Sequence, residues 1–170
     1  MADEFDLEQL YDENAQPLYA FALELTRNEA DTKDVLQNIF TKLAREPRTL
    51  RNVRNVRAYL LRLAHNAAID LIRRRATRDK YADEFGRESE QVFQPASNPD
   101  DEGFRTALSA ALSELPSDQR TVVHLRLWEN LKFEEIADLL SISLNTAASR
   151  YRYGIDKLRQ RLRPLYDEIK

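Results

Sequence analysis

The chain has 170 residues, of which 42% are hydrophobic, and carries a formal net charge of −3 at pH 7, a length that suits one domain or two small ones. Because it contains no cysteine, disulfides, thiolate metal sites and cysteine nucleophiles are excluded, as is typical of a cytoplasmic protein. No apolar run approaches the roughly 20 residues that span a bilayer, and Asp3 and Glu4 stand where a signal peptide would be basic, so we expect a cytoplasmic chain without membrane insertion.

Two amphipathic helices are predicted in the N-terminal part of the chain. Apolar residues recur at helical spacing from Leu7 to a point near Asn28. They recur again from Val35 until Pro47 stops the second helix. Residues 1–46 carry four basic and eleven acidic side chains, so we expect this part to bind a basic partner.

A loop from Pro47 to Asn55 and a third helix follow. The helix has a stripe of apolar residues from Val56 to Leu71. Residues 48–80 carry ten basic and two acidic side chains, so the other faces of this helix are cationic. Because a phosphate senses charge within a Debye length of about 8–10 Å, this patch favours contact with nucleic acid although the net charge of the chain is negative.

Residues 83–103 are predicted to form a flexible acidic linker. They contain two prolines, two of the three glycines and little periodicity, and residues 83–104 carry one basic and seven acidic side chains. The linker separates two small predicted domains, residues 1–82 and 104–170. Because no segment shows sustained strand alternation, we expect an all-α fold of two small helical domains.

The C-terminal domain is predicted to begin with two short helices. The first starts at Phe104 and is ended by Pro116. Ser117 is placed to cap the second, which runs through Trp128. We expect Trp128 to lie in the core rather than to serve as a stacking platform.

Residues 133–162 are typical of a helix-turn-helix. The first helix packs through Ile136, Leu139 and Leu140, and residues 141–143 form a three-residue turn. Ala137 is small where the two helices would cross, and Ser143 can cap the second helix. Residues 145–163 carry six basic and one acidic side chains, so this segment forms the second cationic patch.

The second helix of this motif has a polar face opposite an apolar stripe that begins at Leu144. At about 100° per residue, amide, hydroxyl and guanidinium groups gather on that face, and these groups can hydrogen-bond base edges and hold phosphates. The pattern therefore indicates a helix that reads DNA. The candidate contact residues are Asn145, Thr146, Ser149, Arg150, Arg152 and Tyr153.

These motifs resemble bacterial RNA polymerase sigma factors of the extracytoplasmic-function (ECF) type over nearly the whole chain. The residues that resemble sigma region 4 are Leu115-Pro116 with Arg120, Glu134-Glu135-Ile136-Ala137, Ile142-Ser143, and Thr146 with Ser149-Arg150. Those that resemble region 2 are Asp31, Asp34, Gln37-Asn38 with Phe40, Ala58-Tyr59-Leu60 through Ala64, Asn66, Ile69-Asp70 and Arg73-Arg74-Arg75.

The resemblance implies a protein that binds core RNA polymerase, brings it to promoter DNA and helps to open the duplex. Residues 1–82 would be region 2, residues 104–170 would be region 4, and the last helix would read the minus-35 element through the candidates above. The third helix, with the loop from Arg51 to Asn55 as a pocket wall, would engage the minus-10 element. The implied minus-10 residues are Arg62, Asn66, Arg73, Arg74 and Arg75.

For the acidic N-terminal face, the resemblance implies docking on a basic coiled coil of the largest polymerase subunit. The implied docking residues are Asp31, Asp34, Gln37 and Asn38. Where many relatives have Asp-Ala-Glu-Asp, this chain has Asp-Thr-Lys-Asp, so Lys33 removes two units of negative charge from that face. Either Lys33 points to solvent and costs little, or docking awaits a Ser/Thr kinase, because a phosphate on Thr32 or Thr41 would restore about two negative charges.

The predicted reading helix also departs from the family pattern. Asn145, Ala147 and Ala148 stand where relatives more often have glycine, valine and lysine, so promoter sequence is not transferable. Gly154 lies in the middle of the helix, where glycine costs up to about 1 kcal/mol relative to alanine. Ser141 occupies a turn position where glycine is usual, which indicates modest strain or a different turn.

Two other functions are compatible with parts of the sequence. A stand-alone helix-turn-helix transcriptional regulator would use the N-terminal half for sensing or dimerisation, but it would not need the basic run from Arg73 to Arg75. An all-α adaptor would need no DNA-binding face at all. The resemblance leaves room for an anti-sigma factor as a further partner.

The sequence shows no arrangement of residues typical of catalysis. His65 and His124 lie in different predicted domains, with no cysteine or triad beside them, so packed helix residues are the simpler interpretation. The acidic residues have neither metal-ligand spacing nor a glycine-rich phosphate loop beside them. We therefore expect no enzyme, no cofactor and no metal.

Overall fold

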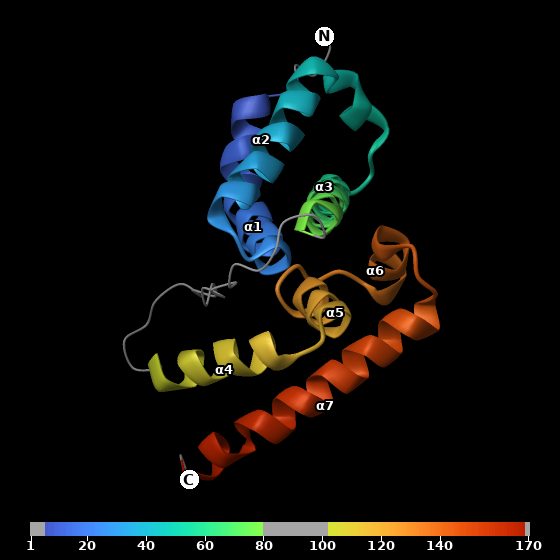
Figure 1. The fold of residues 1–170 in the computed structure, drawn as a ribbon. Coiled ribbons are helices and arrows are strands. Elements are labelled where there is room, and N and C mark those ends of the chain that lie inside the picture. The colour runs from blue at the N-terminus through green and yellow to red at the C-terminus, as the bar shows by residue number, and fades with distance from the viewer. Residues whose placement is uncertain (1–5, 80–101, 169–170) are drawn as a thin grey trace. The chain divides into compact units, whose positions relative to one another are not determined.

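The computed structural model describes residues 6–79 and 102–168, and over these ranges the chain is helical apart from short connections (Figure 1). The described residues form no β-strand, so the expected all-α fold is confirmed. The chain divides into two compact units, residues 1–90 and 91–170. Most of the expected linker lies outside the described residues, but its last two residues, Glu102 and Gly103, already belong to a helix.

The first unit contains α1 (Leu7–Thr26), α2 (Glu29–Arg45), a 3₁₀ helix η1 (Pro47–Asn52) and α3 (Val56–Asp79). The helices α1, α2 and α3 each pack against the other two, as Figure 1 shows. The expected apolar stripes meet between them, and the largest fully buried side chains there are Leu18, Phe21, Val35, Leu43, Leu60 and Leu61.

Local side-chain hydrogen bonds define where the first two helices begin. The Asp6 carboxylate accepts hydrogen bonds from the backbone N–H groups of Glu8 and Gln9, at 3.0 and 3.2 Å. Asn28 accepts one from the backbone N–H of Asp31 at 3.0 Å. Such caps satisfy amides that have no partner within the helix.

The segment after Pro47 is more regular than the expected loop. Pro47 fits the first position of the 3₁₀ helix η1 because its fixed φ suits a helix start. Leu50 is 6% exposed, so its burial anchors the segment.

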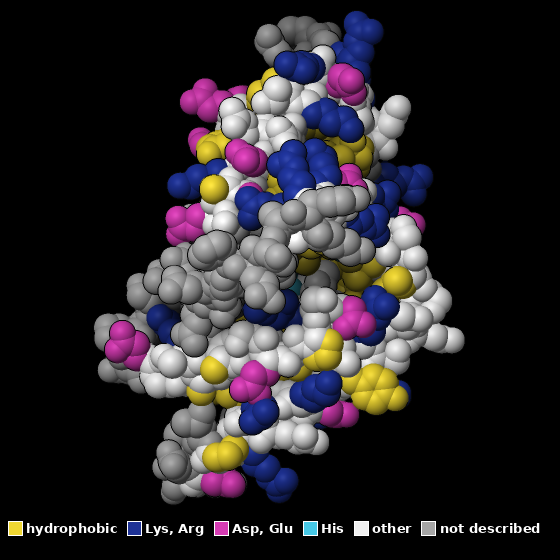
Figure 2. Space-filling view, viewed as in Figure 1, with side chains coloured by type: hydrophobic (Ala, Val, Ile, Leu, Met, Phe, Trp, Pro, Cys, Tyr) yellow, Lys and Arg dark blue, Asp and Glu magenta, His cyan; other side chains and the backbone are white. Residues whose placement is uncertain are grey.

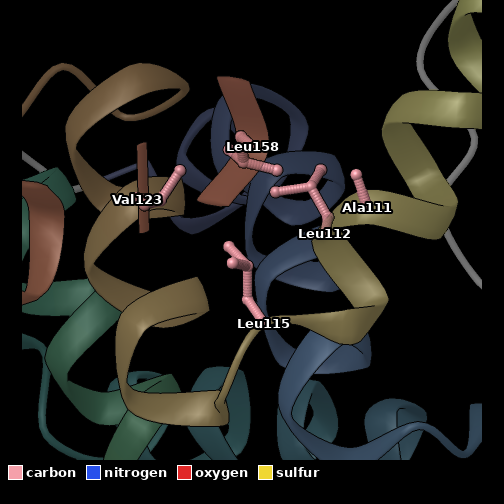
Figure 3. Close-up of a cluster of buried hydrophobic side chains, with 5 residues drawn as sticks. All are labelled: Ala111, Leu112, Leu115, Val123 and Leu158. Atoms are coloured by element: carbon pink, nitrogen blue, oxygen red, sulfur yellow. The ribbon is translucent and has the colours of Figure 1, made fainter. Parts of the chain in front are cut away.

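The second unit contains α4 (Glu102–Glu114), α5 (Ser117–Leu127), α6 (Phe133–Leu140) and α7 (Leu144–Glu168). The long helix α7 packs against α4, α5 and α6. Figure 3 shows side chains from α4, the connection after it, α5 and α7 converging in a buried cluster formed by Ala111, Leu112, Leu115, Val123 and Leu158.

Gly154 explains how α7 approaches α5 so closely. A Cβ atom at position 154 would lie 2.7 Å from the Cγ2 of Val123, closer than two carbon atoms pack. The mid-helix glycine that looked only unfavourable in the sequence is therefore required by the helix crossing.

Two expectations for α5 are wrong. Ser117 makes no side-chain cap, because the residue before the helix is Pro116 and Ser117 is itself the first helical residue. Trp128 is 38% exposed because it follows the last residue of α5. Its ring stacks on the buried ring of His124, with centroids 5.6 Å apart.

No helix in the described part of the chain is both long and apolar enough to cross a membrane.

Candidate nucleic-acid and partner interfaces

The turn between α6 and α7 has the geometry expected of a helix-turn-helix. Ser141 ends α6 in the left-handed conformation, at φ 55° and ψ 45°, which glycine adopts with less strain. The backbone N–H of Ile142 donates to the carbonyl of Ala137 at 2.9 Å. The expected cap is confirmed, because Ser143 Oγ accepts the backbone N–H of Thr146 at 3.1 Å.

Residues 145–153 of α7 divide into an exposed and a partly buried group. Asn145 and Arg152 are exposed and Tyr153 is 53% exposed, whereas Thr146 and Ser149 are partly buried. Their hydroxyls bond locally, Thr146 Oγ1 with Ser143 Oγ at 2.8 Å and Ser149 Oγ with the carbonyl of Thr146 at 3.1 Å. Fewer side chains of this helix therefore present exposed polar groups than the helical projection indicates.

Two other side chains at the start of α7 differ from expectation. Leu144 was expected to face the core but is 46% exposed, because the helix begins at this residue. Arg150 lies beside α5, where its Nε is 3.4 Å from Asp118 Oδ2. Asp118 is 32 positions away in the sequence, so helical projection of α7 alone does not reveal this ion pair.

Two residues that were singled out for their resemblance to region 4 support the fold of the second unit. Arg120 is 8% exposed, and its Nη1 donates to the carbonyl of Ser113 near the end of α4, at 3.3 Å. The Glu135 carboxylate accepts the backbone N–H of Lys132 at 2.8 Å and so fixes the start of α6. Arg120 therefore joins α5 to α4 and Glu135 fixes the start of α6, and all three helices pack against α7.

The cationic side chains of the first unit lie mainly on η1, α3 and the loop between them. Figure 2 shows Lys and Arg side chains gathered over this region. Asn66, Arg73 and Arg74 are exposed, and Arg62 is partly buried. In the loop, Arg51 is exposed, and the other polar side chains expected to form a pocket wall, Asn52, Arg54 and Asn55, are exposed too.

Two polar groups of this region have a structural role. Asn55 Oδ1 accepts the backbone N–H of Ala58 at 3.0 Å, so this residue caps α3. His65 is partly buried on α3. Burial lowers the pKa of His65 below its ordinary value, the hydrogen bond that its ring donates to the Asn66 side chain opposes this shift, and the nearby charge of Arg73 lowers the pKa further.

One predicted minus-10 residue and one predicted docking residue bind each other. Arg75 Nη2 lies 2.5 Å from Asp31 Oδ1. The side chain of Asp31 is 6% exposed and that of Arg75 is 51% exposed. The other predicted docking residues, Asp34, Gln37 and Asn38, are exposed on α2.

An apolar groove on α1 and α2 lies beside these docking residues, and sequence reasoning did not identify it. Its lining residues are Tyr11, Tyr19, Lys33, Leu36, Gln37, Phe40, Thr41 and Ala44. Tyr11 is 50% exposed, and its ring meets that of Phe40 edge-on at 4.8 Å. Exposed aromatic rings beside polar residues are typical of a surface that binds another protein.

The two threonines considered for phosphorylation are in different environments. Thr32 is 0% exposed. Its Oγ1 donates to the carbonyl of Asn28 at 2.8 Å and lies 2.7 Å from Thr26 Oγ1. A kinase therefore has no access to Thr32 in the folded unit, whereas Thr41 is exposed.

Among the residues that the structure describes, no group of three or more His, Asp or Glu side chains is arranged to hold a metal ion.

The two units match two known protein families. Residues 10–78 match the family described as sigma-70 region 2. Residues 111–160 match the family described as sigma-70, region 4. The two matched segments together include α6, the first two thirds of α7 and all but the last residue of the cationic helix α3.

Relatives of similar length cover nearly the whole chain. CarQ, an RNA polymerase sigma factor of Myxococcus xanthus, is 33% identical over an alignment of 165 positions that covers 95% of this chain and 92% of CarQ. SigL, an ECF RNA polymerase sigma factor of Mycobacterium tuberculosis strain H37Rv, is 30% identical over an alignment of 160 positions that covers 92% of this chain and 88% of SigL. SigX, an ECF RNA polymerase sigma factor of Bacillus subtilis, is 27% identical over an alignment of 175 positions, gaps included, that covers 99% of this chain and 89% of SigX.

Two solved structures share the fold. The sigma factor RpoE, in complex with the anti-sigma factor NepR from Bartonella quintana, has a TM-score of 0.78 and 21% identity and covers 93% of this chain and 97% of its own. CnrH, in complex with the cytosolic domain of CnrY, has a TM-score of 0.62 and 22% identity and covers 96% of this chain and 91% of its own. At these identities the likeness concerns the fold alone.

Proposed function

The chain belongs to the sigma-70 family as a sigma factor of the ECF type, which directs RNA polymerase in the initiation of transcription. From this we infer which of its surfaces bind RNA polymerase and which bind promoter DNA. The observation that carries the inference is the ordered pair of region matches, because a stand-alone regulator does not need the first of them. Each matched region also has an exposed polar surface of its own.

The exposed side chains near the start of α7 are proposed to read the minus-35 element in the major groove. Asn145 offers an amide that can pair with adenine, and Arg152 offers a guanidinium that can pair with guanine or a phosphate. Tyr153, which carries a hydroxyl, is 53% exposed, and the guanidinium carbon of Arg152 lies 5.3 Å from the centre of its ring. Thr146, Ser149 and Arg150 are proposed to shape this surface, with Ser143 capping the helix beneath it.

The cationic surface of α3 and the preceding loop is proposed to hold the minus-10 element during strand separation. Arg73 and Arg74 would contact phosphates, and Asn66 would contact an unstacked base, because single strands are bound by cationic grooves with polar or stacking side chains. Arg62 and the exposed polar residues of the loop complete this surface. The melting step and each residue role are parts of the proposal.

The exposed face of α2 is proposed to dock on core RNA polymerase through Asp34, Gln37 and Asn38. The apolar groove beside them would take the apolar side chains of a helix whose basic residues face Asp34. Lys33 is exposed and lines that groove, so its charge would lie at the proposed interface. If phosphorylation restores the negative charge, Thr41 is the accessible site.

An anti-sigma factor is a further proposed partner. RpoE and CnrH were each solved with a second protein, the anti-sigma factor NepR and the cytosolic domain of CnrY. The proposal rests on the shared fold of the three sigma chains.

Run-off transcription tests the function as a whole. Purified core RNA polymerase is supplied with a library of genomic promoters, with and without the full chain. We expect specific transcripts that begin downstream of a shared two-part motif, and Asn145→Ala should change the preferred upstream element while leaving the downstream element unchanged. Promoter-specific binding by the chain alone, without any binding to core polymerase, would instead identify a stand-alone regulator.

A further inference from the structure

The Asp31–Arg75 pair joins two surfaces that sequence patterns assign to different partners. Asp31 lies in the first turn of α2, the helix proposed to dock on polymerase, and Arg75 lies near the end of α3, the helix proposed to bind promoter DNA. The two residues are 44 positions apart in the sequence, and their side chains are joined by a hydrogen-bonded ion pair of 2.5 Å. Each side chain therefore has an internal partner.

The carboxylate of Asp31 is buried within the first unit. The residue is 4% exposed, and a carboxylate removed from water needs a charged or hydrogen-bonding partner. Its position in the first turn places the negative charge near the positive end of the α2 dipole. Arg75 supplies the partner while keeping a 51% exposed side chain, so only its guanidinium end reaches inward.

The pair ties the C-terminal turns of α3 to α2, beyond Ala68, which is the last buried residue of that helix. Successive residues of an α-helix are separated by about 100°, so Arg74 and Arg73 project about 100° and 200° away from Arg75. Neither can replace Arg75 against α2. Holding Arg75 on α2 therefore directs the two exposed arginines to other, outward-facing sides of α3.

We propose that Asp31 and Arg75 are positioning residues, an internal pair that orients the C-terminal turns of α3 for promoter DNA, and that neither contacts polymerase or DNA directly. This inference rests on the proposed function for its effect on promoters, but the pair itself is a property of the free chain.

A double-mutant cycle on the free, full-length chain tests the pair. Asp31→Asn, Arg75→Gln and the double variant are unfolded in urea, with circular dichroism as the signal. Each single substitution should lower the folding equilibrium constant about tenfold, a value between those of exposed and buried ion pairs. The double variant should be no worse than the less stable single variant. Additive losses would overturn the pair, whatever happens in transcription.

Matched neighbours distinguish positioning from contact in the complex. Asp34 and Arg74 are exposed residues of the same two helices. At a temperature where every variant is fully folded, Asp34→Asn should weaken binding to core polymerase, and Asp31→Asn should leave that affinity unchanged. Arg74→Gln should reduce the salt dependence of promoter binding by the amount of one phosphate contact, a log–log slope of about 0.7–0.9, and Arg75→Gln should leave the slope unchanged.

The positioning role itself is read from the maximal level of open promoter complex at saturating sigma factor. Asp31→Asn and Arg75→Gln should lower that level severalfold, and the double variant should lower it no further. A merely stabilising pair would leave the level unchanged in folded protein and would overturn the positioning role. A lowered salt slope for Arg75→Gln would show that Arg75 contacts DNA, and weaker core binding for Asp31→Asn would show that Asp31 contacts polymerase. Either result would overturn the proposal. If the wild-type chain supports no transcription at all, the proposed function fails, while the cycle in the free chain still decides the pair.

Discussion

At the scale of single residues, Gly154 shows a conflict between helix propensity and packing. Alanine is favoured over glycine in a helix by up to about 1 kcal/mol, but its Cβ at this position would lie 2.7 Å from Val123 Cγ2. We expect Gly154→Ala to destabilise the second unit by about 1–3 kcal/mol, because overpacking a crossing of two helices costs more than the propensity gains. Urea unfolding of the full chain measures the change.

Two further variants control for this interpretation. Gly103 lies in α4, where a Cβ would meet nothing within 4 Å, so Gly103→Ala should be neutral or slightly stabilising. In a Val123→Ala background the added methyl has room, so Gly154→Ala should then cost less than in the wild-type chain. An equal cost in both backgrounds would show that the crossing does not explain the glycine.

His65 provides a pH-dependent term in the stability of the first unit. Burial lowers its pKa in the folded state below the ordinary value of about 6.5. Between these two pKa values the unfolded chain binds more protons than the folded chain, so the free energy of unfolding should fall as the pH drops below about 6.5. Unfolding measured from pH 7.5 to 5.5 should show this loss, and His65→Gln should reduce the slope. An unchanged slope in the variant would assign the effect to other groups.

At the scale of elements, the start of α7 depends on a single hydroxyl. Ser143 Oγ accepts the N–H of Thr146, and removing such a cap costs about 0.5–2 kcal/mol. Ser143→Ala should therefore lower the stability of the second unit by about 1 kcal/mol and weaken promoter binding. Ser143→Asp should retain the stability, because a carboxylate can accept the same hydrogen bond. Equal melting temperatures for the two variants would contradict the cap.

At the scale of the whole molecule, the chain contains two compact units, each with buried side chains of its own. The chain has one tryptophan, and Trp128 belongs to the second unit, so its fluorescence reports that unit. Leu60→Ala and Leu125→Ala remove matched, fully buried side chains from the first and second unit, at a cost of about 2–5 kcal/mol each. Only Leu125→Ala should shift the tryptophan transition, whereas circular dichroism should detect both. A shift of the tryptophan signal in Leu60→Ala would show that the units unfold together.

The sequence by itself determined the helical fold and the helix-turn-helix, because these depend on interactions between residues close in the chain. It also determined the family, because the family motifs are recognised by their order and spacing along the chain. Apolar residues recur at helical spacing, Ser143 lies three residues before the amide it caps, and Pro47 stops α2 locally. The exposed candidates Asn145 and Asp34 were also predictable, because their faces follow from the helical period.

Only the tertiary structure decided which polar side chains form ion pairs within the chain. Asp31, Arg75 and Arg150 have the residue types of contact residues, but each meets an oppositely charged group from a distant segment. Gly154 likewise has meaning only beside Val123. A guanidinium binds a phosphate or a carboxylate through the same hydrogen-bond donors, so residue type leaves both partners open, and the packing of helices distant in sequence decides whether a carboxylate of the same chain lies within reach.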